Sequence, residues 1–172
     1  MKFILLLQFI GFTLFAHSLT PVSYVDAKRF SGLWYEVART YNSYQERCVG
    51  SSVEYKLVGE SEYEVFNRCF DTKIGGDLIE YEGSAEPESG LNMSSINMTY
   101  FWIFTKNYKV YYLQNDYNYA VVADDNFEQV WIMSRKPAMP KEKLSEILAY
   151  LSDAIDTQNF IFTPQDPKGR YR

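Results

Sequence analysis

The chain has 172 residues, of which 47% are hydrophobic and 17% aromatic, and its net charge is −5 at pH 7. This length supplies one domain with a sizeable core, and the composition excludes a disordered or collagen-like chain and favours sheet over helix. An acidic chain without a basic run is a poor candidate for binding nucleic acid or anionic membranes through charge.

The first eighteen residues differ from the rest of the chain. Lys2 is followed by an apolar run over residues 3–15 and by the small-x-small sequence Ala16-His17-Ser18. The run is shorter than the roughly 20 apolar residues that span a membrane. We therefore predict a signal peptide over residues 1–18, cleaved near Ser18, and a periplasmic or secreted domain over residues 19–172. No cysteine follows the run, so we expect no lipoprotein modification and no stable membrane anchor.

The single histidine, His17, lies in this predicted leader. The leader carries one lysine and no acid, so the net charge becomes −6 after cleavage. Cleavage also removes His17, so no histidine remains. Ser-His-Asp and Cys-His catalysis and histidine-ligated zinc are therefore excluded for the mature chain. Asp124 and Asp125 lie in a turn with too few oxygen ligands for calcium. We expect no metal and no cofactor.

The first predicted elements surround Gly32. Residues 26–30 form a single helical turn, and Gly32 then lets the backbone bend sharply before a strand over residues 33–41. Trp34 places a large flat ring at the start of this strand. The polar segment 42–47 is predicted to be a loop.

Seven further strands follow, mostly separated by short turns such as Gly59-Glu60, Gly75-Gly76 and Lys106-Asn107. The predicted strands are 49–58, 62–69, 77–85, 95–105, 108–114, 119–123 and 128–134. No crossover of helix length separates them, so the pattern indicates an antiparallel meander folded as a sandwich or a barrel. A barrel of eight strands has room for one small ligand.

The periodicity changes after Pro140. Leu144, Ile147, Leu148 and Leu151 recur at helical spacing and predict an amphipathic helix over residues 141–153. This helix is expected to pack outside the sheet. Residues 160–162 are predicted to form a short edge strand, and the tail from residue 164 onward is predicted to be mobile.

Three separated segments carry a resemblance to a known family. They are Gly-Leu-Trp-Tyr-Glu-Val-Ala-Arg at 32–39, Asn-Asp-Tyr-Asn-Tyr-Ala-Val-Val at 115–122, and Trp-Ile-Met-Ser-Arg-Lys-Pro at 131–137. With these three segments in this order, residues 26–165 resemble the lipocalins, and among them the bacterial lipocalin and apolipoprotein D branch. The resemblance implies an all-β, eight-stranded antiparallel up-and-down barrel with one C-terminal α-helix packed outside. Residues 104–108 depart from the branch, because they lack its proline and glycine.

The resemblance also implies how one end of the barrel is closed. Arg135 should lie across the face of Trp34, in a cation–π contact worth about 1–2 kcal/mol where water is excluded. Gly32, Trp34 and Arg135 are thus expected to be structural residues.

Side chains alternate between the two faces of a strand, so three reference residues predict which neighbours point into the barrel. Trp34 and Arg135 are expected to face inward, and Lys109 is expected to face solvent. The predicted ligand-binding residues are Glu36, Ala38, Tyr108, Val110, Tyr112, Trp131 and Met133. An apolar and aromatic cavity with a few hydroxyls suits an acyl chain with a polar head. The alternative is that these side chains fill the barrel completely.

Two features bear on covalent or acid–base chemistry. Cys48 and Cys69 are expected to form a disulfide, because two cysteines in a small secreted domain usually pair. By closing a loop of about 20 residues, this disulfide would contribute about 3 kcal/mol to the free energy of unfolding. A bulge is needed to bring the two cysteines opposite each other, because a regular hairpin does not pair them directly. Glu36, if it faces inward, needs an internal tyrosine or arginine partner or contacts the head of a ligand.

Asn92 and Asn97 begin glycosylation triplets whose use depends on the source.

These observations predict a binding protein, not an enzyme. Its expected partner is a small hydrophobic ligand such as a fatty acid or lysophospholipid. The ligand is expected to enter past the loop 42–47. The resemblance also allows a homodimer and a role in membrane maintenance. One alternative is a lipocalin-fold enzyme acting on a lipid or isoprenoid through Glu36 or an unpaired cysteine. Another is an interaction module with a filled barrel.

Overall fold

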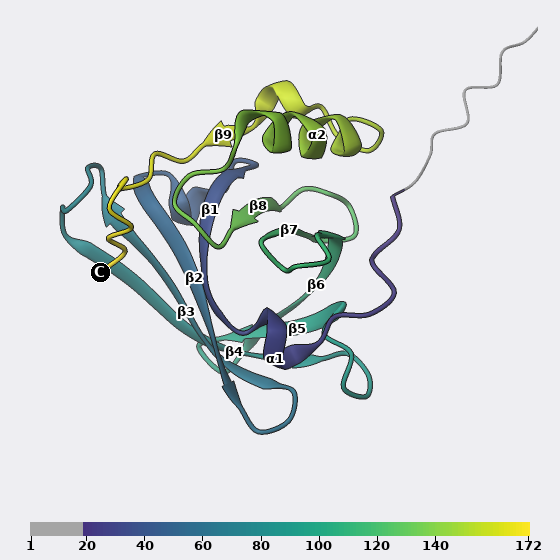
Figure 1. The fold of residues 1–172 in the computed structure, drawn as a ribbon. Helices are drawn as coiled ribbons and strands as arrows, with labels where there is room; N and C mark the ends of the chain where they lie inside the picture. Colours follow the sequence, from purple (N-terminus) through teal and green to yellow (C-terminus); the bar gives the residue numbers. More distant parts are fainter. Residues whose placement is uncertain (1–18) are drawn as a thin grey trace, which may run out of the picture.

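A computed structural model describes residues 19–172, so the predicted signal peptide over residues 1–18 lies outside the described part of the chain. Its core is one antiparallel sheet (Figure 1). The strands are β1 (Gly32–Arg39), β2 (Cys48–Val58), β3 (Glu62–Asp71), β4 (Leu78–Pro87), β5 (Ser95–Tyr100), β6 (Phe104–Leu113), β7 (Tyr119–Ala123), β8 (Val130–Ser134) and β9 (Ile161–Phe162).

The sheet closes on itself. Strands β2 to β8 follow one another in sequence order, β8 pairs with β1, and β1 pairs back with β2, while β9 adds to β1 from outside this ring. Closure leaves the eight ring strands without a free edge. The predicted eight-stranded antiparallel barrel and the short strand near residue 161 are therefore confirmed.

The helices lie at the ends and on the outside of the barrel. The short α1 (Ala27–Phe30) precedes β1, and α2 (Lys141–Leu151) lies outside the sheet beside β9 (Figure 1). Two 3-10 turns, η1 (Ser43–Gln45) and η2 (Thr157–Asn159), complete the described elements. Between residues 19 and 172 no helix is long and apolar enough to cross a bilayer.

Apolar side chains gather in two clusters on opposite faces of the sheet. The inner cluster lies inside the barrel and includes Trp34, Tyr55, Tyr63, Met98, Tyr108, Val110 and Met133. The outer cluster lies between the barrel and α2 and includes Ala38, Tyr111, Val121, Ile132, Ile147 and Leu151. The fully buried Ile147 and Leu151 confirm that α2 turns its apolar stripe toward the sheet.

Two bulges change which residues face inward. The register between β1 and β8 shifts between Glu36 and Ala38, and the register between β6 and β7 shifts between Val110 and Tyr112. Each bulge adds one residue, so the alternation reverses beyond it. The inward placement of Ala38 and Tyr112 is therefore wrong. Ala38 belongs to the outer cluster, and Tyr112 packs against that cluster beside Tyr150.

The turn near residue 105 also differs from the prediction. Instead of one strand over 95–105, β5 ends at Tyr100, residues 101–103 form the turn, and β6 begins at Phe104. Lys106 and Asn107 lie within β6. Phe101 and Trp102 adopt left-handed φ values of 53° and 62°. Such turns normally carry glycine, asparagine or aspartate, so two aromatic residues there gave no turn signal in the sequence.

The C-terminal tail packs on the barrel, contrary to the predicted mobile end. The carbonyl of Pro164 accepts a hydrogen bond from the Gly50 amide at 2.7 Å, and the Tyr35 hydroxyl donates to the carbonyl of Gly169 at 2.8 Å. Asp166 is buried. The tail thus extends the wall formed by β1 and β2.

Candidate ligand-binding cavity

One end of the barrel is closed by the predicted pair. The guanidinium carbon of Arg135 lies 3.8 Å from the centroid of the Trp34 ring, and the indole Nε1 donates to the Phe30 carbonyl at 2.9 Å. Arg135 also donates to the carbonyls of Leu33 and Arg29, at 2.9 and 2.8 Å. Burial lowers the pKa of Arg135 to about 10, which leaves it charged at neutral pH.

Gly32 permits this close approach. Its φ is +93°, and a Cβ atom at this position would lie 3.4 Å from Nη1 of Arg135. A side chain would therefore be strained by its backbone conformation, and its Cβ would be in contact with the guanidinium.

The other end opens into a cavity of about 610 Å³, within the usual range for small-ligand sites. In an antiparallel meander the connections after β1, β3, β5 and β7 meet at one end, away from Trp34. Side chains from the connections after β1, β5 and β7 line the mouth. Much of the remaining lining is apolar and includes Val53, Tyr55, Met98, Val122 and Met133.

Polar side chains gather near the mouth. The Tyr108 hydroxyl donates to Oε1 of Gln129 at 2.7 Å, and Nε1 of Trp131 donates to Oε1 of Gln45 at 3.0 Å. All four side chains line the cavity. The cavity therefore offers both apolar and polar side chains to a ligand with an apolar tail and a polar head.

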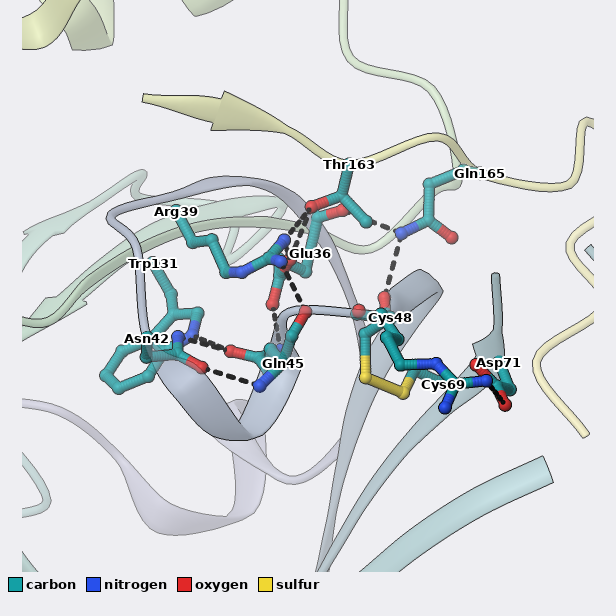
Figure 2. The surroundings of a disulfide bond; sticks show 12 residues. Glu36, Arg39, Asn42, Gln45, Cys48, Cys69, Asp71, Trp131, Thr163 and Gln165 are labelled. Carbon is teal, nitrogen blue, oxygen red and sulfur yellow. Dashed lines mark hydrogen bonds and ion pairs between the residues drawn. A yellow bond between two sulfur atoms is a disulfide. The ribbon is translucent and has the colours of Figure 1, made fainter. Parts of the chain in front are cut away.

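Glu36 is held by internal partners, as expected (Figure 2). Its Oε1 lies 3.0 Å from Nη1 of Arg39 and accepts a hydrogen bond from the Thr163 hydroxyl, and its Oε2 accepts from Nε2 of Gln45 at 2.7 Å. Glu36 and Arg39 are 5% and 2% exposed. The carboxylate is thus part of a buried ion pair.

The tail is tied to the same strand. Nε2 of Gln165 donates to the backbone carbonyls of Glu36 and Ser51, at 2.7 and 2.8 Å. Thr163 and Gln165 therefore fasten the chain after β9 over the junction of β1 and β2 (Figure 2).

Cys48 and Cys69 form a disulfide beside the cavity, with their Cα atoms 5.3 Å apart. The register of β2 against β3 shifts between Val49 and Ser52, which supplies the predicted bulge. The chain has two cysteines in total, so neither remains as a thiolate nucleophile.

The structure brings together four of the seven residues predicted to bind ligand. Glu36, Tyr108, Trp131 and Met133 line the cavity, whereas Val110 is buried in the inner cluster without lining it. Ala38 and Tyr112 face the outer cluster. Sequence reasoning did not assign several lining residues to the cavity, namely Tyr44, Gln45, Asn67, Tyr100 and Gln129. Tyr44 and Gln45 lie in the loop 42–47, past which the ligand was expected to enter, whereas no sequence pattern pointed to Asn67, Tyr100 or Gln129.

The family model for a lipocalin-like domain matches residues 25–165. The chain belongs to this family. The lipocalin is 29% identical over 150 residues to outer membrane lipoprotein Blc of Vibrio cholerae, covering 86% of this chain and 87% of that one. It is 28% identical over 143 residues to apolipoprotein D of Bos taurus, covering 78% and 71%. Membership supports binding of a small hydrophobic ligand, and relatives of this kind are in general binding proteins.

Solved structures agree on the fold. Insecticyanin of the tobacco hornworm Manduca sexta superimposes with a TM-score of 0.71 at 21% identity, covering 88% of this lipocalin and 86% of that chain. Lobster apocrustacyanin A1 gives a TM-score of 0.63 at 24% identity, covering 81% and 79%.

The buried tyrosines of this lipocalin predict a loss of stability in alkali. Burial raises the pKa values of Tyr55, Tyr63 and Tyr108, so the folded protein keeps protons that the unfolded chain releases above about pH 10. The stabilisation is complete below that pH and is lost as pH rises through the folded pKa values. We expect the urea midpoint to fall between about pH 9 and about pH 11. A constant midpoint over this range would contradict the burial of these phenols.

Proposed function

We propose that this lipocalin binds and carries a fatty acid or lysophospholipid. The acyl chain would lie against apolar lining such as Met98 and Met133, and the head group would lie among polar side chains such as Tyr108 and Trp131. The observation that carries the proposal is an open cavity of about 610 Å³ with an apolar wall and polar groups at its mouth. No reaction is proposed.

A secreted or periplasmic location fits this role. The predicted leader would direct export, and the Cys48–Cys69 disulfide is of the kind that persists in oxidising compartments. A soluble carrier in such a compartment would move a poorly soluble lipid between membranes, which is one form of membrane maintenance.

Filling the cavity tests the proposal. We expect Met98→Trp to weaken binding of a fluorescent fatty acid by about tenfold, because the indole occupies the space of the acyl chain. Met98 is buried and lines the cavity. Affinity would be measured by fluorescence titration, and lipid extracted from the purified wild-type protein would be identified by mass spectrometry.

The matched control is Leu78→Trp, which adds the same ring on an exposed position of β4 outside the cavity. Near-ultraviolet circular dichroism would verify that both variants keep their packing. The proposal is wrong if the wild-type protein neither yields a stoichiometric lipid nor binds the fluorescent acid, or if both variants bind equally well.

A further inference from the structure

Four consecutive apolar residues are exposed at the turn between β5 and β6. We call Phe101, Trp102, Ile103 and Phe104 the hairpin tip, and their exposed fractions are 60%, 97%, 75% and 64%. Single exposed apolar residues are ordinary on a protein surface, but a contiguous group marks an interaction site.

Folding alone does not account for these residue types. None of the four belongs to the inner or the outer cluster. Phe101 and Trp102 also occupy left-handed backbone positions, which glycine or asparagine would adopt with less strain. Strained positions that carry bulky side chains are typical of functional segments. The tip therefore serves a purpose outside the packing of the barrel.

The tip lies at the rim of the cavity. Phe101, Ile103 and Phe104 line the mouth, whereas Trp102, the most exposed of the four, does not. A partner that covers Trp102 would therefore face the opening through which a ligand enters.

The chemistry of the tip fits a lipid surface. From Tyr100 to Lys106 the segment contains no acid and one cation, and that lysine is paired with Asp124 at 2.7 Å. An uncharged, protruding turn with an indole at its apex matches the interfacial zone of a bilayer, where tryptophan is enriched. The connections after β1, β3 and β7 carry more acids than cations, and Asp125 is paired with Lys109 at 2.7 Å, so this end of the barrel does not attract an anionic surface.

We propose that the hairpin tip inserts reversibly into the interface of an electrically neutral bilayer and presents the mouth of the cavity to it. Only the purpose of this docking, exchange of the ligand with the membrane, rests on the proposed function. The docking itself is a property of the tip and is measured without added ligand.

Flotation of the purified protein with phosphatidylcholine vesicles tests the inference. We expect Trp102→Ser to weaken partitioning by about fivefold, because it removes the largest exposed ring, and Trp102→Tyr to stay within about twofold of wild type. Raising the salt from about 0.1 M to about 0.5 M should change binding by less than about twofold, since the attraction is apolar.

Leu91→Ser is the matched control. Leu91 is 56% exposed but lies in the connection between β4 and β5, at the closed end of the barrel. It should float like wild type. The inference is overturned if wild type does not float, if Trp102→Ser floats equally well, or if Leu91→Ser loses as much.

Two further measurements separate the remaining readings. Light scattering that shows a wild-type dimer reduced to a monomer by Trp102→Ser, without flotation, would replace the membrane by a second copy as the partner and overturn the inference. Binding of a fluorescent fatty acid in vesicle-free buffer should be unchanged in Trp102→Ser. If flotation fails while this binding persists, the docking inference falls and the proposed function stands.

Discussion

Replacing Glu36 by glutamine is expected to lower the free energy of unfolding by about 3–5 kcal/mol, because it leaves a buried arginine without its counter-charge. Arg39 is 2% exposed and has Glu36 as its only carboxylate partner among the described residues. Urea unfolding followed by tryptophan fluorescence would measure the change. A second replacement, Arg39→Met, should recover much of the loss, because it removes the unpaired charge.

The matched control is Glu82→Gln at an exposed position of β4, which should stay within about 0.5 kcal/mol of wild type. An equally small effect of Glu36→Gln would show that the ion pair is not buried in solution. A loss of function in Glu36→Gln would reflect destabilisation as readily as loss of a catalytic carboxylate, so this variant does not separate a binding protein from an enzyme.

The hydrogen bonds of Glu36 separate those readings better. Both carboxylate oxygens already accept from Arg39, Thr163 or Gln45. A general base needs a free lone pair directed at its substrate. Three of about four lone pairs of the Glu36 carboxylate are thus occupied by internal partners, and Cys48 and Cys69 are joined in a disulfide, so neither feature favours the enzyme alternative.

Replacing Trp34 by alanine is expected to cost about 3–5 kcal/mol, the range for deleting a fully buried aromatic side chain. The ring is 0% exposed, lies 5.0 Å from the Phe30 ring and supports Arg135 on its face. For a chain of this size the melting temperature should fall by roughly 10 °C. Calorimetry would measure both quantities.

Trp102→Ala is the control, because it makes the same change on a ring that is 97% exposed. It should leave the melting temperature within about 1–2 °C of wild type. If both variants are equally stable, Trp34 does not close the barrel as described.

Much of this architecture could be predicted from local sequence. Glycine and asparagine turns separated most of the strands, and helical spacing identified the apolar stripe of α2. These signals are local, because turn chemistry and periodicity act over a few neighbouring residues. The stacking of Arg135 on Trp34, two residues far apart in the sequence, was instead implied by the resemblance to the lipocalins.

Only the tertiary structure decided which side chains share the cavity. One extra residue in β1 and one in β6 reversed the alternation, so Ala38 and Tyr112 left the inner face. The bulge in β1 also lets Arg39 reach Glu36, although residues three apart in a regular strand point to opposite faces. Such bulges depend on how the partner strands meet, which strand periodicity alone does not reveal. For the same reason the sequence and its resemblance to the lipocalins predicted a barrel and a class of ligand, while the pairing of the strands determined which side chains line the cavity and which are exposed at the hairpin tip.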